Sequence, residues 1–327
     1  METIQYIGES VWQGAAGHLL VIVAFVSAIA GSYANFKAVR NTDGWLNLGR
    51  AFFSIHALSV FAMIGLLLAI MIGQRYEYVY VWEHVSEDLP MRYIFSAFWE
   101  GQEGSFLLWM LWHAVLGIFL LRSGKWEAPV MGTLLLVEVF ITSMLLGIHI
   151  TDDIKIGVNP FALLRETMQA PIFARSDYLT MIEGNGLNPL LQNYWMTIHP
   201  PTLFLGFASV TVPFCFAMGG LITKDHTGWL RPALPWALFS AAILGTGILM
   251  GGAWAYEALS FGGYWAWDPV ENMSLVPWLI LVAGVHAHLI SRSTGESMRT
   301  AYALYISSFL LILYSTFLTR SGVLGDS

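Results

Sequence analysis

Four aromatic side chains fall within seven residues of the segment FGGYWAWDPVENMSLVPWL (residues 261–279), namely Phe261, Tyr264, Trp265 and Trp267. Gly262 and Gly263 lie among them and carry no side chain that would crowd a ligand laid on the backbone. Tryptophan and tyrosine also gather at membrane interfaces, so Trp254, Tyr256, Trp267 and Trp278 could form no more than such a belt. The density of the rings favours a flat apolar platform for a planar ligand. The residue types alone leave both interpretations open.

The sequence DPVE follows these rings and is typical of a helix start. Asp268 has the side chain of an N-cap, Pro269 suits the first helical position, and Glu271 stands three residues after the cap, as in a capping box. We therefore expect a helix to begin here, directly after the aromatic stretch.

A histidine in the segment TIHPPTLFLGF (residues 197–207) could bind a metal. His199 comes directly before Pro200 and Pro201, which fix their own φ and push the preceding residue toward an extended conformation. Neutral imidazole is a common iron ligand. A lone histidine near lipid headgroups is also commonly just a polar surface residue. His199 is therefore either an iron ligand or such a surface residue, and the presence of iron would distinguish the two.

A third stretch, FWEGQEG (residues 98–104), is an acidic turn before an apolar run. Glu100 and Glu103 are favourably placed at the positive end of a helix dipole. The same carboxylates could orient a substrate in a site.

Five ionisable side chains lie inside apolar runs: His18, His56, His113, Glu138 and His286. Such groups are costly in a membrane and are functional candidates by default. We expect the rings of His18, His56 and His113 to be satisfied within the bundle, and Glu138 either to accept a proton or to pair with one of them.

The second histidine of VAGVHAHLIS, His288, follows His286 by two positions. On a helix the two rings point in different directions, so they cannot jointly hold one ion.

The elements that must position these residues are membrane-spanning helices. Of 327 residues, 56% are hydrophobic and 11% are charged, and the mean hydropathy is +0.62, so the chain has too few charges to coat a soluble globule of this size. A single cysteine excludes an internal disulfide. We predict an all-α, polytopic membrane bundle from eight apolar runs, at about 11–34, 51–73, 101–121, 128–150, 195–222, 235–256, 272–291 and 300–319.

The loops between these runs predict the orientation. With the N-terminus and C-terminus on the extracytoplasmic side, the short inner loops carry nine of the fifteen basic residues. They are Lys37, Arg40, Arg50, Arg122, Lys125, Lys224, Arg231, Arg292 and Arg299. We therefore expect residues 1–327 to form a single membrane-embedded bundle with an extracytoplasmic loop over 151–194. We expect this loop to form short helices. The aromatic stretch, His199 and the acidic turn then share the outer side.

Five motifs in order give the chain a resemblance to a known family. They are GQEGSFLLW (101–109), IHPPTLFLGF (198–207), WAYEALSFGGYWAWDPVENMSLVPWL (254–279), His286 after PWL, and FLTRSGVL (317–324). Together they resemble the haem-handling family with a tryptophan-rich WWD domain, and within it the haem lyase subunits of cytochrome c maturation. The likeness covers nearly the whole chain.

The resemblance implies a haem platform at 257–271 and a function. A haem lyase component would position substrate haem there for thioether attachment to the CxxCH cysteines of apocytochrome c. His199 would be an axial ligand of that haem iron, and His286 a ligand of a separate, buried haem b that transfers electrons. The residues implied to bind these haems are His199, Pro200, Gly262, Gly263, Tyr264, Trp265, Trp267, Asp268 and His286. Those implied to serve catalysis are Trp265, Trp267, Asp268 and Glu271.

The resemblance also implies a location and partners. The chain would lie in the bacterial cytoplasmic (inner) membrane with its functional face toward the periplasm. Its partners would be a chaperone carrying covalent haem, apocytochrome c, the apocytochrome-holding and thioreductive maturation subunits, and the lipid bilayer, with no nucleic acid.

The family pattern and this chain differ in length. Family members are about twice as long, and the second axial histidines follow beyond the motif TRSGVL (319–324). The expectation is therefore an N-terminal half that needs a second chain or a missing C-terminal half for activity. Buried Glu138 and the histidines keep a proton-coupled or haem-exporting transporter open as an alternative, and the acidic outer face keeps a non-catalytic scaffold open.

Overall fold

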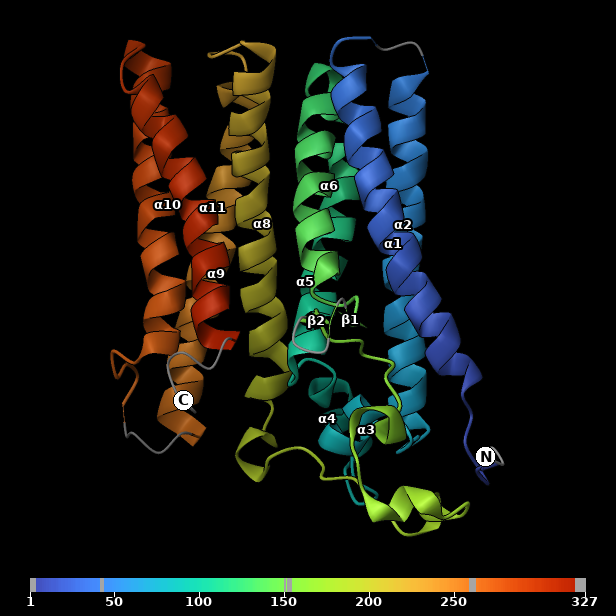
Figure 1. Ribbon diagram of the computed structural model, residues 1–327. Helices are drawn as coiled ribbons and strands as arrows, with labels where there is room; N and C mark the ends of the chain where they lie inside the picture. The colour runs from blue at the N-terminus through green and yellow to red at the C-terminus, as the bar shows by residue number, and fades with distance from the viewer. Residues whose placement is uncertain (1–3, 42–43, 150, 152–154, 259–262, 321–327) are drawn as a thin grey trace. The chain divides into compact units, whose positions relative to one another are not determined.

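The computed structural model describes residues 4–41, 44–149, 151, 155–258 and 263–320 (Figure 1). Within these residues eight helices are long and apolar enough to cross a membrane, which confirms the predicted all-α, polytopic bundle. They are α1 (Trp12–Ala38), α2 (Trp45–Ile72), α5 (Gln102–Leu120), α6 (Glu127–Ser143, after the 3-10 turn η1, Gly124–Trp126), α8 (Trp195–Thr223), α9 (Leu230–Ala258), α10 (Pro269–Thr294) and α11 (Met298–Arg320).

Shorter elements occupy the connections. They are α3 (Val79–His84), α4 (Met91–Ala97), α7 (Leu164–Thr167), the 3-10 turns η2 (Pro171–Ala174), η3 (Tyr178–Thr180) and η4 (Pro189–Leu191), and an antiparallel hairpin of β1 (Ile148–His149) and β2 (Lys155–Ile156). The prediction of short helices in the loop over 151–194 is thus confirmed.

The predicted fourth span, 128–150, was too long at its C-terminal end. Helix α6 ends at Ser143, and Gly147 then adopts a φ of +60°. A side chain at Gly147 would also come within 2.8 Å of the Asn159 backbone nitrogen, so only glycine fits this close approach. The apolar run therefore continues past the end of the helix into β1.

The chain divides into two compact units. Unit 1 comprises residues 1–26, 55–108 and 139–192, and unit 2 comprises 27–54, 109–138 and 193–327. The single bundle expected for 1–327, the outer loop and the platform boundaries stay predictions.

Helices α8 to α11 form the larger part of unit 2. Helix α8 packs against α9 and α11, and α10 packs against α9 and α11 (Figure 1). Two glycines allow the close approach of α8 and α9, because a Cβ on Gly206 would lie 2.8 Å from the Leu244 Cα and one on Gly247 would lie 3.0 Å from the Leu203 Cα. This packing holds the N-terminal turns of α8 against the C-terminal turns of α9.

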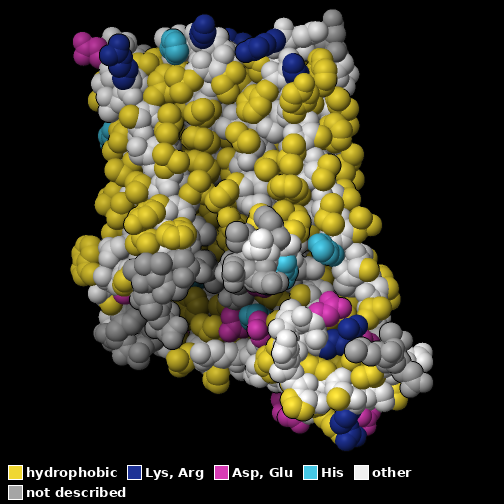
Figure 2. Space-filling view, in the orientation of Figure 1, with side chains coloured by type: hydrophobic (Ala, Val, Ile, Leu, Met, Phe, Trp, Pro, Cys, Tyr) yellow, Lys and Arg dark blue, Asp and Glu magenta, His cyan; other side chains and the backbone are white. Residues whose placement is uncertain are grey.

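Large apolar side chains cover the flanks of the helices (yellow in Figure 2). Leu58 is 68% exposed and Leu249 is 77% exposed, which suits contact with lipid and not with water.

Lys and Arg side chains gather at one end of the helices of unit 2 (dark blue in Figure 2). The Arg50 guanidinium binds Glu127 through two bonds of 2.6 and 2.8 Å, and the Lys125 ammonium lies 2.8 Å from Asp225. The loops predicted to be basic therefore meet at a common end, while the membrane side of that end stays a prediction.

Candidate functional site

His199 lies in the second turn of α8, and its backbone is helical, so the predicted extended conformation is wrong. The preference set by a following proline is steric and modest. Pro200 and Pro201 lie inside α8, so the packing of this helix must outweigh the two backbone hydrogen bonds that they cannot donate. Polar contacts support this stretch: Thr202 Oγ1 donates to the Ile198 carbonyl at 2.8 Å, and Trp112 Nε1 donates to the Pro201 carbonyl at 3.0 Å.

The imidazole of His199 lies against α9. A Cβ on Gly251 would stand 3.0 Å from its Cε1, so the missing side chain provides room for the ring. Trp254 meets the ring edge-on, with centroids 5.6 Å apart and an interplanar angle of 65°. His199 Nδ1 is buried and finds no hydrogen-bond partner in the described chain. One ring nitrogen is thus left for a ligand.

The predicted capping box at the start of α10 is confirmed. The Asp268 carboxylate accepts from the Glu271 backbone nitrogen at 2.9 Å. In return, Glu271 Oε2 accepts from the backbone nitrogens of Asp268 at 3.3 Å and of Ala266 at 2.9 Å. Both carboxylates therefore position the aromatic loop, and Glu271 Oε1 stays buried without a partner among the described residues.

The rings of the aromatic loop divide between a cavity and the surface. Trp265 is partly buried and lines a cavity with His199, whereas Trp267 is 71% exposed and stands at 86° to Trp265. The φ of Trp267 is +58°, which costs a bulky residue about 1–3 kcal/mol and occurs where surroundings impose it. Tyr264 is also exposed and stacks on Tyr256 at 4.4 Å.

Two glycines of the loop were predicted to make room for a ligand. A Cβ on Gly263 would meet nothing within 4 Å, so open space lies above the backbone there. Gly262 lies outside the described residues.

The cavity beside His199 has a volume of about 170 Å³. It brings together four buried polar atoms for which the described chain offers no partner: His199 Nδ1, Trp254 Nε1, Trp265 Nε1 and Glu271 Oε1. Buried polar atoms are nearly always paired, and an unpaired one costs about 1–3 kcal/mol. Two N–H donors, a carboxylate oxygen and an imidazole nitrogen in one cavity are therefore suited to the polar groups of a ligand.

The size of this cavity limits what it can hold. Pockets that enclose a drug-sized ligand measure about 300–1,000 Å³, so this one admits only an edge of a planar macrocycle. A second cavity, of about 280 Å³, shares Leu203, Val270 and Ser274 with the first. It continues along Phe204, Phe207 and Met273 to the hydroxyls of Ser315, Thr316 and Thr319. Together they line a trough with an apolar middle and polar side chains at both ends, at His199 and at Ser315, Thr316 and Thr319.

Sequence reasoning missed Gly251 and Gly252 and assigned Trp254 only to an interfacial belt. Gly252 lies against the Tyr264 carbonyl, which a Cβ would approach to 3.0 Å. The glycine pair inside the apolar run of α9 was a usable signal, because a glycine is costly within a helix unless something packs closely there. Pro200 does not line the cavity.

His286 lies apart from this cavity, on the exposed surface of α10. Its Nδ1 donates to the Val282 carbonyl at 2.8 Å, which fixes the tautomer and leaves the lone pair of Nε2 available. His288 is fully buried, with Nδ1 2.9 Å from the Tyr305 hydroxyl. The expectation that the two rings point apart is confirmed.

Glu138 pairs with His113, one of the two alternatives for this carboxylate. His113 Nδ1 lies 2.6 Å from Glu138 Oε1, and its Nε2 lies 2.9 Å from Thr211 Oγ1, in a group that joins α5, α6 and α8. Both ring nitrogens are therefore satisfied.

The other two histidines expected to be satisfied behave differently from each other. His56 Nδ1 bonds the Ala24 carbonyl at 2.9 Å, as expected. His18 departs from the expectation, since its buried Nε2 finds no partner in the described residues.

The acidic turn lies in unit 1 at the start of α5, whose first turn contains Glu103. Burial raises the pKa of Glu100 to about 7, although the Asn188 backbone N–H lowers it in part. Its Oε2 is buried without a partner in the described chain. Glu100 is thus a carboxyl that titrates near neutral pH, next to Asn188 of the loop over 151–194.

This shift predicts a pH dependence of stability. Because the folded-state pKa of Glu100 is raised, its contribution is present below about pH 4.5, the ordinary pKa, and is lost as the pH rises through about 7. Glu100→Gln should therefore unfold at a higher temperature than the wild type at pH 8 and show little gain at pH 5, in thermal unfolding of the detergent-solubilised chain. Glu87→Gln, at an exposed carboxyl of the same unit, is the control. Equal responses of both variants would contradict the assignment.

Comparisons with known proteins identify a family that this chain resembles. Residues 99–324 match the sequence family described as Cytochrome C assembly protein. The cytochrome c-type biogenesis protein CcmF of Pseudomonas aeruginosa is 35% identical over 315 residues, which cover 94% of this chain and 45% of that protein. CcmF of Escherichia coli is 31% identical over 311 residues, covering 94% and 45%.

A solved structure titled Cytochrome c Heme Lyase CcmF superposes with a TM-score of 0.78 at 25% identity, covering 99% of this chain and 50% of that one. The chain spans about half the length of the curated relatives it matches.

Proposed function

This chain belongs to the Cytochrome C assembly protein family, and on that premise we propose that it is a haem-handling component of a cytochrome c haem lyase. In this proposal it holds haem at the periplasmic face of the inner membrane for attachment to the CxxCH cysteines of apocytochrome c. Relatives named for cytochrome c biogenesis support the general role. The observation that carries the haem role is the cavity with four unpartnered polar atoms around His199.

Each residue of the cavity has a part in the proposal. The imidazole of His199 binds the haem iron through its unpartnered nitrogen, since imidazole is a common iron ligand. The indole N–H groups of Trp254 and Trp265 donate to acidic groups of the substrate. Asp268 and Glu271 position the loop through the capping box and do not themselves react.

Orientation is the main contribution of the protein to the chemistry. A thiol S–H adds across a vinyl C=C of the substrate haem, so that a C–S and a C–H bond form and no oxidant is consumed. Holding the two reacting groups in a near-attack arrangement can supply about 7–11 kcal/mol of the barrier reduction. The trough beside His199 supports such positioning, because it admits one edge of the macrocycle and leaves the rest accessible.

His286 has a separate role in the proposal, as a ligand of a membrane haem b. The bond at Nδ1 fixes the tautomer, and the side chain is exposed, so Nε2 is able to bind the iron of a haem on the surface of α10. The second iron ligand of this haem b would come from a further segment or chain, which would correspond to the other half of the relatives' sequences. The haem chaperone, the apocytochrome-holding subunit and the thioreductive subunit are the proposed partners on the outer side.

Substitutions in the aromatic loop test the platform. In a His286→Ala background, which removes the membrane haem b of this proposal, Trp265→Ala, alone or with Trp267→Ala, should lower the haem retained by the purified chain about tenfold, as expected for losing roughly 1.4 kcal/mol of binding. A pyridine haemochrome spectrum per mole of protein measures this retention. Trp12→Ala, at an exposed tryptophan of α1, is the matched control and should retain haem like the wild type.

Gly263→Ala sharpens the test. A Cβ at this position meets no described residue within 4 Å, so the fold should be unaffected and any loss of haem reports a ligand lying over the loop. Full haem retention in Trp265→Ala and Gly263→Ala together would reject the platform. A wild-type chain that binds no haem at all would instead favour a transporter or a scaffold.

A further inference from the structure

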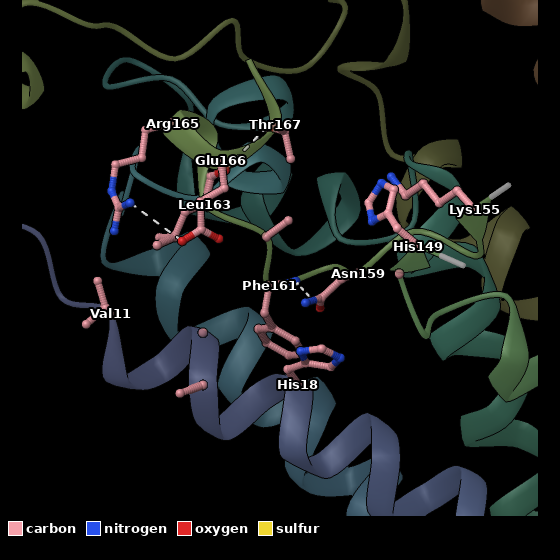
Figure 3. A pocket seen from close by; sticks show the side chains of 14 residues that line it. Val11, His18, His149, Lys155, Asn159, Phe161, Leu163, Arg165, Glu166 and Thr167 are labelled. Atoms are coloured by element: carbon pink, nitrogen blue, oxygen red, sulfur yellow. Dashed lines mark hydrogen bonds and ion pairs between the residues drawn. The ribbon is translucent and has the colours of Figure 1, made fainter. Parts of the chain in front are cut away.

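A cavity of about 650 Å³ lies within unit 1, far larger than the one beside His199 (Figure 3). Three segments line it: the N-terminal turns of α1, the β1–β2 hairpin, and the stretch from residue 159 through α7. No step of the proposed haem chemistry uses it.

The wall formed by α1 is one face of the helix. Val11, Gly14, Ala15 and His18 recur at spacings of three and four, so their side chains point the same way. The small residues Gly14 and Ala15 leave space, and the Phe161 ring closes the floor, packed so closely against α1 that a side chain at Gly17 would not fit.

The polar groups of the cavity are mainly donors. His18 Nε2 is buried without a partner in the described chain. Asn159 Oδ1 already accepts from the Phe161 backbone nitrogen at 2.9 Å, which leaves its amide NH₂ as a donor. His149 and Lys155 stand opposite each other in the hairpin, both exposed, with no side-chain bond to any described residue (Figure 3).

Two cations and two carboxylates surround the cavity, and Lys155 is the cation that no described carboxylate pairs with. The Arg165 guanidinium lies 2.9 Å from Glu9 and 3.5 Å from Glu166, so it is shared between two carboxylates. Lys155 makes no ion pair within the described residues, and the rings of His18 and His149 add two further donors. The set is complementary to an oxyanion that offers several acceptors at once.

The depth of the cavity suggests where such an oxyanion would come from. Helix α1 has 27 residues, hence a length of about 40 Å, whereas the hydrocarbon core of a bilayer is about 30 Å thick. The first turns of α1 therefore reach the headgroup region, and the cavity lies at those turns.

We propose that this cavity binds a phosphate-type oxyanion, carried by an anionic lipid headgroup or free in solution. Lys155, His149, Asn159 and His18 donate to its oxygens, while Val11, Ala15 and Phe161 contact the apolar part of a lipid. The site is independent of haem binding.

Native mass spectrometry of the full chain in detergent tests the site with three probes: phosphatidylglycerol, phosphatidylcholine of the same acyl chains, and inorganic phosphate. The wild type should retain phosphatidylglycerol over phosphatidylcholine. Lys155→Ala should weaken that retention about fivefold, the usual contribution of one lysine near a membrane surface, and His149→Ala should add to the loss. Arg92→Ala removes an exposed cation of the same unit outside the cavity and should change nothing.

A steric variant shows whether lipid is retained by the cavity or by the general charge of the surface. Ala15→Phe fills the space from an exposed position, leaves every charge in place, and should also abolish retention of the lipid. Binding of inorganic phosphate with the same sensitivity to Lys155→Ala supports the oxyanion site with a free source. The proposal is overturned if Lys155→Ala and Arg92→Ala behave alike, or if the wild type neither prefers phosphatidylglycerol nor binds phosphate.

Discussion

His199→Ala is expected to lower haem retention at the outer site by more than about 100-fold, since even groups that merely orient a metal ligand contribute about 10–100-fold to affinity. The fold should survive, because His199 Nδ1 has no hydrogen-bond partner in the described chain and the substitution removes one bond, between the imidazole and the Gly247 backbone. Retained haem is measured by the pyridine haemochrome spectrum of the purified chain, and the yield of holocytochrome c is measured in cells.

Two further variants show whether this loss belongs to the cavity. Gly251→Ala places a Cβ 3.0 Å from Cε1 of His199 and should turn or displace the ring, with a smaller loss of outer haem. His286→Ala is the matched histidine control and should spare the outer haem, while it removes a separate haem b signal. Wild-type haem content and cytochrome c yield in His199→Ala would show that this histidine is not a ligand.

Glu138→Leu is expected to destabilise unit 2 by about 1–3 kcal/mol, the usual effect of leaving a buried hydrogen-bonding group without its partner. The side chains of His113 and Glu138 are 0% and 2% exposed, and the substitution leaves His113 Nδ1 without this carboxylate in an apolar interior. Unfolding of the chain in mixed micelles with increasing denaturing detergent measures the effect.

The double variant His113→Leu with Glu138→Leu completes a thermodynamic cycle. It should recover most of the stability lost in either single variant, because neither polar side chain is then buried without the other, apart from about 1 kcal/mol for the bond to Thr211. Additive losses in the double variant would mean that the two side chains do not act as a pair.

Several parts of the fold could be predicted from sequence because they are local properties. The spans follow from the lengths of apolar runs, which bilayer thickness sets, and the α10 start follows from Asp268 and Glu271, which bond each other three positions apart. The expectation for His199 failed although it was equally local, because a proline preference is weaker than the continuation of a helix packed on α9.

Other parts of the site depend on contacts between residues far apart in the chain. His113 bonds Glu138, which lies 25 residues later in the chain. No sequence pattern shows that His113 chooses this carboxylate over other buried acceptors. The same holds for His18, where the sequence predicts a satisfied ring and the structure has Nε2 lining a cavity formed with residues 147–167.

The sequence by itself determined that this chain is a membrane bundle of eight helices and that Asp268 and Glu271 begin α10, since hydropathy and capping act over short stretches. Only the tertiary structure decided that His199, Trp254, Trp265 and Glu271 share one cavity while Trp267 faces outward. The reason is geometric. A sequence gives the direction of each side chain around its own helix, but not which helix it faces. The close packing of α8 and α9 at Gly206 and Gly247 brings their side chains within contact distance.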